Sequence, residues 1–199
     1  MAKYVNSSEV RYALGITGNT QIARETVARA RETANQLTKL GYDATMYAYK
    51  KGHGSGIAEK KPIGDGKWRH RSRNLHDSFG YAVYCNGTLI PSSIGYIGGE
   101  LSKIVDPLTK LSGRETLNQF FRRSHYGRAK GDMVLVCVAA MYYVKYLEEG
   151  RHRGGYKIQV ISAARDYVDQ NWNKYLNAKQ RAIVFKGVKP ISNESVGLL

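Results

Sequence analysis

Histidines and cysteines are the residues of this chain best suited to nucleophilic or metal chemistry. They are His53, His70, His76, His125 and His152, with Cys85 and Cys137. A catalytic pair needs a nucleophile and a base within hydrogen-bond reach, and no histidine here adjoins a recognisable nucleophile turn. No His-x-x-x-His or Cys-x-x-Cys spacing occurs. We therefore expect core thiols, surface histidines, and neither catalytic nor metal-binding residues.

Phosphate-binding and paired-carboxylate patterns are equally weak. The segment from Lys51 to Gly56 is rich in glycine, but it matches neither the P-loop nor the dinucleotide fingerprint. Glu148 and Glu149 are adjacent, and neighbouring side chains on a helix point about 100° apart. We expect at least one of them to pair with a nearby arginine. The sequence predicts a protein without a cofactor and without enzymatic activity.

Charge and tyrosine content point instead to binding. The 199 residues include 31 Lys and Arg against 16 Asp and Glu, for a net charge of +15. Such a balance favours a polyanion, most often nucleic acid, or an acidic protein neighbour. The 15 tyrosines, against 4 Phe and 2 Trp, suit interfaces that are partly wet. Assembly or nucleic-acid contact is therefore expected before catalysis.

The positive charge is concentrated in residues 50–73, whose net charge is +6. We predict that this segment is an arm that orders on assembly, against DNA phosphate or an acidic protein surface. Its anchors would be aromatic side chains, which give much contact area for few rotamers. The candidate contacts are Lys50, Lys51, Lys60, Lys61, Lys67, Arg69, Arg71, Arg73, Arg151 and Arg153, with Tyr47, Tyr49 and Trp68 as anchors.

A long N-terminal helix should follow Asn19, the expected N-cap, and end at Gly41. Ala23, Val27 and Leu37 belong to its apolar stripe. Residues 1–17 have no clear period, and residues 42–72 are expected to be a long loop. A second long helix should begin near Ile158 and continue to about Ile183.

Strands and turns are expected between these helices. Residues 73–78 indicate a short helical turn, and 79–85 a strand that a hairpin at Asn86-Gly87 connects to 88–90. Residues 114–123 suit a short helix, and the apolar run 133–140 a buried strand.

The expected fold is α+β, a small antiparallel sheet packed against two long helices with long extended loops and arms. We predict one domain over 1–199, with a core at about 19–183, insertions at about 42–72 and 91–131, and a C-terminal arm at about 187–199. The loops at 50–72 and 91–112 should be mobile in a free subunit. No apolar run approaches a membrane span, so no membrane contact is expected.

Two short motifs lie in the predicted turns before the first strand and before the last helix. In the first, the turn pattern Asn-Leu-x-Asp-Ser precedes a strand. In the second, Tyr-x-x-Tyr leads to Glu-Gly before the last helix. The matching residues are Asn74, Leu75, Asp77 and Ser78, then Tyr143, Tyr146, Glu149 and Gly150.

Together these motifs resemble the tail-completion or neck (head–tail joining) family of tailed bacteriophages, and the resemblance implies a structural virion protein. Copies would form a ring, twelvefold in our expectation, around the DNA channel at the head–tail junction. Its partners would be further copies of itself, portal or adaptor and tail proteins, and the passing genomic DNA. It would be made in the bacterial host cytoplasm and reside in the virion, in the neck or upper tail. The alternatives are a free basic nucleic-acid-binding protein and, third, a nuclease or other genome-processing enzyme.

Overall fold

The computed structural model describes residues 4–57, 68–70, 73–98, 105–127, 129–151 and 157–177, with backbone alone for 55–57 and 68–70. The helices are α1 (Ser7–Ala13), α2 (Gln21–Gly52), α3 (Asn74–Asp77), the 3-10 turn η1 (Pro91–Ser93), α4 (Gly113–Arg123), α5 (Val144–Glu149) and α6 (Ser162–Tyr175). The strands are β1 (His53–Ile57), β2 (Trp68–His70), β3 (Phe79–Cys85), β4 (Thr88–Leu89), β5 (Gly95–Tyr96) and β6 (Met133–Ala139).

Strand β3 is the centre of a four-stranded antiparallel sheet. Along one side it pairs with β6 over its whole length, from Phe79 opposite Ala139 to Cys85 opposite Met133. Along the other side it pairs with β4 at one end and β5 at the other. A separate two-stranded parallel pair joins β1 to β2.

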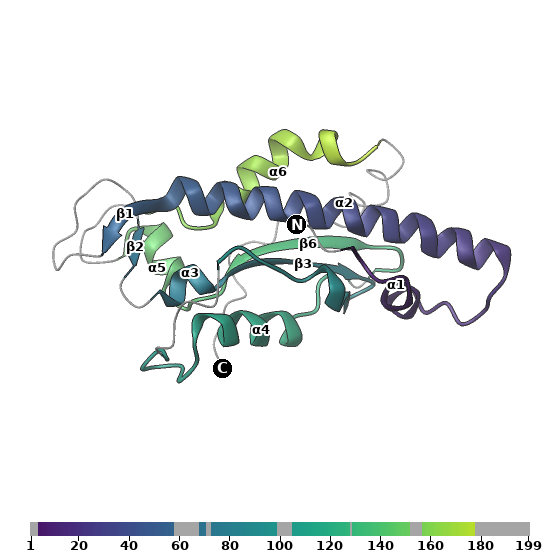
Figure 1. The fold of residues 1–199 in the computed structure, drawn as a ribbon, viewed down its shortest axis with the longest axis horizontal. Coiled ribbons are helices and arrows are strands. Elements are labelled where there is room, and N and C mark those ends of the chain that lie inside the picture. The colour runs from purple at the N-terminus through teal and green to yellow at the C-terminus, as the bar shows by residue number, and fades with distance from the viewer. Residues whose placement is uncertain are drawn as a thin grey trace.

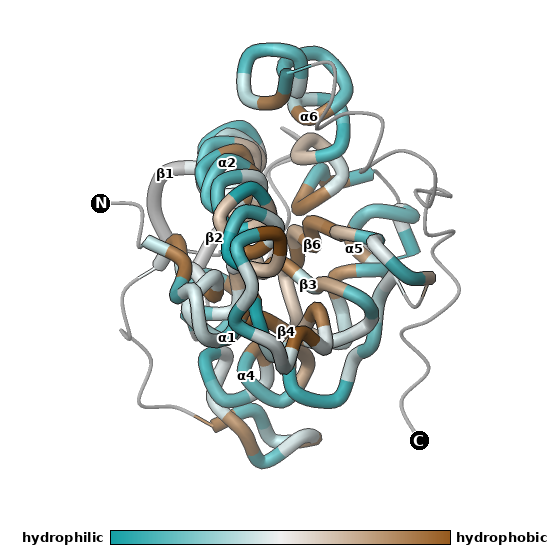
Figure 2. Tube along the Cα trace, turned by 90° about the vertical axis from the view of Figure 1, so that its right-hand side faces the viewer, coloured by the Kyte–Doolittle hydropathy of each residue, from teal (hydrophilic) through white to brown (hydrophobic). Residues whose placement is uncertain are grey.

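Helices cover both faces of this sheet (Figure 1). Alternate side chains of a strand point to opposite faces. Val83 and Met133 therefore pack with Leu37 of α2, whereas Ala82 and Val136 pack with α4. The strands between the helix layers are rich in apolar residues, as the brown parts of the tube in Figure 2 show. The α+β class with a small antiparallel sheet and a long helix is confirmed.

Helix α2 is much longer than expected and corrects the prediction for residues 42–52. It begins after Thr20, whose side chain accepts from the Ala23 N–H, and continues through Gly41 to Gly52. Gly41 lies within the helix and does not end it. Tyr81 and Leu135 pack so closely on this position that a Cβ would lie 2.7 Å from Leu135. The glycine serves close packing of helix on sheet, and the predicted loop 42–72 is wrong for its first part.

The two terminal regions also differ from expectation. Residues 7–13 form α1, which Asn6 caps, and Glu9 fixes it by accepting from the Ser92 N–H at 2.7 Å. Helix α6 ends at Tyr175 rather than near Ile183. It lies on α2 (Figure 1), where Ala44 and Ala48 meet Ala163 and Ala164, rather than on the sheet. The small alanines allow this close approach.

The remaining predicted elements are confirmed at 74–77, 79–85, 88–89, 113–123 and 133–139. The hairpin turn places Asn86 and Gly87 at positive φ of 51° and 78°, as a two-residue turn requires. Within the predicted insertion 91–131, η1, β5 and α4 are ordered elements. Residues 58–67, 71–72, 99–104 and the arm 187–199 lie outside the described residues.

Candidate functional site

The two predicted motif turns pack against each other at one end of the molecule. Leu75 of the first turn and Val144 of the second belong to one buried cluster. Tyr49, Tyr143 and Leu147 pack on its border. In Figure 1, α3 and α5 lie together with β1, β2 and the last turns of α2. We call this region, built from the end of α2, α3, β1, β2 and α5, the motif end.

The first turn begins at a residue with positive φ and is stabilised by hydrogen bonds of its own. Arg73 precedes α3 with a φ of 64°, a left-handed conformation uncommon outside glycine. Leu75 is buried, and its carbonyl accepts a 2.8 Å hydrogen bond from the Ser78 hydroxyl. As predicted, Leu75 anchors the turn and Ser78 terminates it.

Asn74 connects the first turn to α4. Its side chain is buried, and its Oδ1 accepts from the Gly113 N–H at 3.2 Å. A Cβ on Gly113 would overlap the carbonyl oxygen of Asn74. The Asn74 side chain therefore accepts a hydrogen bond from the N-terminus of α4, and that N-terminus packs directly on the backbone of the first turn.

His76 and Asp77 form a buried pair, which corrects the prediction that the histidines are on the surface. The His76 Nδ1 and Asp77 Oδ1 lie 2.7 Å apart, and Asp77 is fully buried. The edge of His76 meets the ring of Tyr49 at a centroid distance of 5.3 Å. Five consecutive residues, 74–78, are thus buried although four of them are polar or charged.

Tyr49 belongs to this end of the core, not to a free arm. Its ring stacks on His53 at 5.3 Å and meets Phe79 edge-on at 5.5 Å. Burial, with the nearby Asp77 carboxylate, raises the pKa of Tyr49 above its usual value. Helix α2 continues through residue 49 and turns this partly buried side chain toward the cluster. The role of Tyr49 as an interface anchor stays a prediction.

The second turn ends α5 in a left-handed C-cap. Gly150 has a φ of 73°, and its N–H donates to the Leu147 carbonyl. Tyr143 is half-buried, and burial together with Asp106 raises the pKa of its phenol above the usual range. Tyr146 is 51% exposed. Arg151 Nε lies 2.9 Å from Glu149 Oε2, the charge pair expected at this turn.

Glu148 has a role that sequence reasoning missed. Its Oε1 accepts from the N–H groups of Val160, Ile161 and Ser162 at 3.0, 2.7 and 2.8 Å. These donors begin α6, so the carboxylate replaces the missing N-cap and meets the positive end of the helix dipole. A local sequence pattern could not indicate this cap, because Glu148 lies twelve or more residues before the N–H groups it caps.

The predicted basic contacts are only partly placed by the structure. Lys50, Lys51, Arg73 and Arg151 are exposed around the motif end. The Lys51 Nζ lies 5.6 Å from the centre of the Tyr47 ring, which is itself 41% exposed. Trp68 and Arg69 are in β2, where the backbone alone is described. Lys60, Lys61, Lys67, Arg71 and Arg153 lie outside the described residues.

The two thiols lie in the sheet, and burial raises the pKa of each to about 11. At neutral pH they are therefore protonated and poorly nucleophilic. Over the part of the chain that is described, no three His, Cys, Asp or Glu side chains gather as metal ligands would. The helices among these residues include none long and apolar enough to cross a membrane.

At the motif end, several elements pack together around buried polar groups at 74–78. Lys50, Lys51 and Tyr146 are exposed on its surface. Comparison of the chain with protein-family models, with curated proteins and with solved structures gave no match.

Proposed function

We propose that this protein is a structural component of a tailed-bacteriophage virion, forming a ring around the DNA channel at the head–tail junction. The observation that carries the proposal is the union of the two motif turns. Segments 74–78 and 143–150 are far apart in sequence, yet Leu75 and Val144 share one buried cluster. Motifs that fold into one unit support a common role better than scattered matches would.

Exposed aromatic and aliphatic side chains at two separate places suit a ring. Tyr47 and Tyr146 are exposed at the motif end. Tyr12 of α1 is 80% exposed and Ile22 of α2 is 77% exposed. Helix α1 and the first turn of α2 lie on the side of the molecule away from the motif end (Figure 1). A closed ring needs two different faces on each subunit, because each copy binds its neighbour head to tail.

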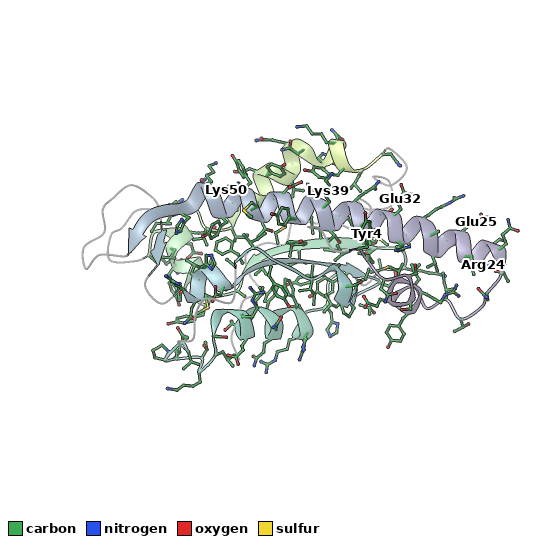
Figure 3. The ribbon with its side chains drawn as sticks, viewed as in Figure 1. Tyr4, Arg24, Glu25, Glu32, Lys39 and Lys50 are labelled. Atoms are coloured by element: carbon green, nitrogen blue, oxygen red, sulfur yellow. The ribbon has the colours of Figure 1, made fainter. Side chains whose placement is uncertain are left out.

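The charges on α2 suit contact with a neighbouring protein better than contact with a continuous line of DNA phosphates. Figure 3 shows Arg24, Glu25, Glu32, Lys39 and Lys50 following one another along the helix. All five are exposed. Because acidic side chains interrupt the basic ones, this side of α2 is mixed in sign. Such a surface fits neighbouring protein, while the more basic motif end would face portal, adaptor or tail proteins, or the passing DNA.

Particle composition and assembly state test the proposal. The protein should be present in purified virions and absent from the free pool after assembly. Native mass spectrometry should show a closed ring, twelvefold in our expectation, when portal and adaptor proteins are added. Absence from virions would overturn the proposal.

The alternative, a free basic nucleic-acid-binding protein, gives a different outcome. Its affinity for duplex DNA would fall steeply as salt rises, because phosphate contacts release counterions, and tight binding by a monomer that persists at about 200 mM salt would favour this alternative. A ring protein around a channel must let DNA pass, and should bind it weakly under the same conditions. Filter binding of the purified monomer at rising salt distinguishes the two, and metal-dependent DNA cleavage in the same assay would identify a nuclease.

A further inference from the structure

A basic segment follows the body of helix α4. Residues 116–131 contain no Asp or Glu and four basic residues, Arg122, Arg123, Arg128 and Lys130. The structure leaves Arg122, Arg123 and Lys130 exposed, and Arg128 lies outside the described residues. Across the described part of the chain, none of these three side chains forms an ion pair with a carboxylate. Their charges are therefore free to meet an outside partner.

The loop after α4 is closed on the hairpin turn between β3 and β4. The His125 Nδ1 lies 3.2 Å from the Gly87 carbonyl oxygen. The Gly131 N–H donates to the Asn86 Oδ1 at 2.6 Å. Because both ends of the loop bond adjacent residues of one turn, the loop brings Lys130 back to the same end of the sheet as the last turn of α4.

The end of α4 that carries the two arginines is also fixed. The Tyr84 hydroxyl, buried in the sheet, donates to the Phe121 carbonyl at 2.8 Å. The Phe121 side chain is itself fully buried. The backbone that presents the two arginines is therefore held in place before any partner binds, which lowers the entropy cost of binding.

The acidic residues that border the segment are engaged in turns of their own. The Asp132 Oδ2 accepts from the Ala129 N–H at 3.2 Å. The Glu115 Oε2 accepts from the Ser112 N–H at 2.7 Å, and Glu115 precedes Arg122 by about two helical turns. The surface around the end of α4 therefore keeps a single sign of charge.

This surface differs in kind from the surface of α2. Helix α4 covers the face of the sheet away from α2 (Figure 1), whose exposed charges are mixed in sign. Among the described residues, the exposed large apolar side chains lie outside 116–131. Protein interfaces are centred on large apolar or aromatic anchors and are poor in charge at their core, whereas interfaces with DNA are polar and strongly basic. The segment therefore fits phosphate better than an acidic protein.

We propose that residues 122–130 contact the phosphates of duplex DNA. Arginine binds a phosphate through two parallel N–H groups, and lysine acts as a point charge beside it. In the ring of the proposed function, on which this placement rests, the segment of each subunit would line the channel. Few charges for each subunit suit DNA that must pass, because each contact is weak and is lost readily in salt.

Fluorescence anisotropy of the full chain with a labelled DNA duplex tests the proposal. The test variant and its matched control each remove three exposed positive charges: Arg122→Gln, Arg123→Gln and Lys130→Gln in the first, Arg24→Gln, Arg29→Gln and Lys39→Gln in the second. At about 50 mM salt the test variant should lose at least about tenfold in affinity and the control less than about threefold. The slope of log affinity against log salt should become shallower by up to about 3 in the test variant alone.

A second variant separates lost charge from lost structure. The double variant Arg122→Lys, Arg123→Lys keeps both charges and should bind within about threefold of the native protein, since phosphate contact is largely electrostatic. Equal urea midpoints for the native protein and all variants show that each is folded. Equal losses of affinity in the test variant and its control would show that only net charge matters, and would overturn the proposal.

Two further outcomes distinguish this proposal from the proposed function. A test variant with native affinity for DNA but no binding to portal or adaptor protein would assign the segment to an acidic protein and overturn the DNA contact. The proposed function would survive that result if rings still appear in native mass spectrometry of the native protein. Conversely, loss of DNA affinity confined to the test variant would support the phosphate contact even if the protein were absent from virions.

Discussion

The two ends of helix α2 are built in opposite ways. At its C-terminal end, Tyr49 packs into a cluster where Asn74, Asp77 and Ser78 are buried and hydrogen-bonded. At its N-terminal end, the first turn is exposed and includes Ile22, an apolar side chain left 77% in solvent. The two ends therefore differ in construction: the motif end buries hydrogen-bonded polar groups, whereas the first turn of α2 leaves an apolar side chain in solvent.

This difference predicts where substitutions cost stability. A buried polar group that loses its partner costs far more than an exposed one, because water cannot replace the lost bond. Changes at the motif end should therefore lower the free energy of unfolding by several kcal/mol at most, whereas changes at the first turn of α2 should leave stability nearly unchanged and affect association.

Gly113→Ala should have the largest effect. The new methyl group would overlap the Asn74 carbonyl and push α4 from the first motif turn. We expect a loss of about 3 kcal/mol in the free energy of unfolding. Gly18→Ala, where nothing lies within 4 Å of the added atom, is the control and should change stability by less than about 0.5 kcal/mol. Urea denaturation measures the free energy of unfolding of both variants, and equal losses would contradict the difference proposed between the two ends.

Glu148→Ala should come next. It removes the acceptor of three N–H groups at the start of α6, at a cost of about 2 kcal/mol. Thr20→Ala, which removes the single cap bond at the exposed start of α2, should cost about 1 kcal/mol or less. Thermal unfolding followed by circular dichroism would show the difference, and a larger loss for Thr20→Ala would contradict it.

Alkaline pH should weaken the fold more gradually. The folded protein holds the Cys85 and Cys137 protons to about pH 11, whereas free thiols lose theirs near pH 9.0. Above pH 9 the unfolded state therefore binds fewer protons, and stability falls as pH rises. The midpoint of urea unfolding should be constant from pH 7 to 8.5 and decrease at pH 10. The double variant Cys85→Ala, Cys137→Ala should flatten this decrease.

Ile22→Ser should have the smallest effect on stability, within about 0.5 kcal/mol, because the side chain is already in water. It should nevertheless reduce ring formation in native mass spectrometry, whereas the neighbouring exposed Gln21→Ser should not. Normal assembly of Ile22→Ser would remove the first turn of α2 from the proposed subunit contact.

Local patterns in the sequence predicted most of the sheet and missed the last third of the longest helix, residues 42–52. The Asn-Gly hairpin and the valine-rich run need only neighbouring residues to be recognised. Gly41 led to a wrong prediction of the helix end, because sequence alone does not distinguish a glycine that ends a helix from one on which a tyrosine packs closely. Ala44 and Ala48, which continue the stripe on α2 and meet α6, were the available signal for a longer helix.

At the candidate site, the sequence located the two turns but not their union. The Ser78 cap and the Glu149–Arg151 pair join residues three or fewer positions apart, so they could be anticipated. Tyr49 and Glu148 act across long separations, and nothing in their neighbours indicates a partner. Burial of His76 likewise depends on the meeting of α2 with α3.

The pairing of β3 with β6 also sets the expected order of folding. The strands are separated by about fifty residues, with α4 between them, whereas β4 and β5 follow β3 directly. Short loops close with less loss of chain entropy than long ones. We therefore expect the β3–β4–β5 unit to form first on α2, and β6 to dock late. Until it does, the apolar edge of β3 is open to other chains, so slow folding here would favour aggregation.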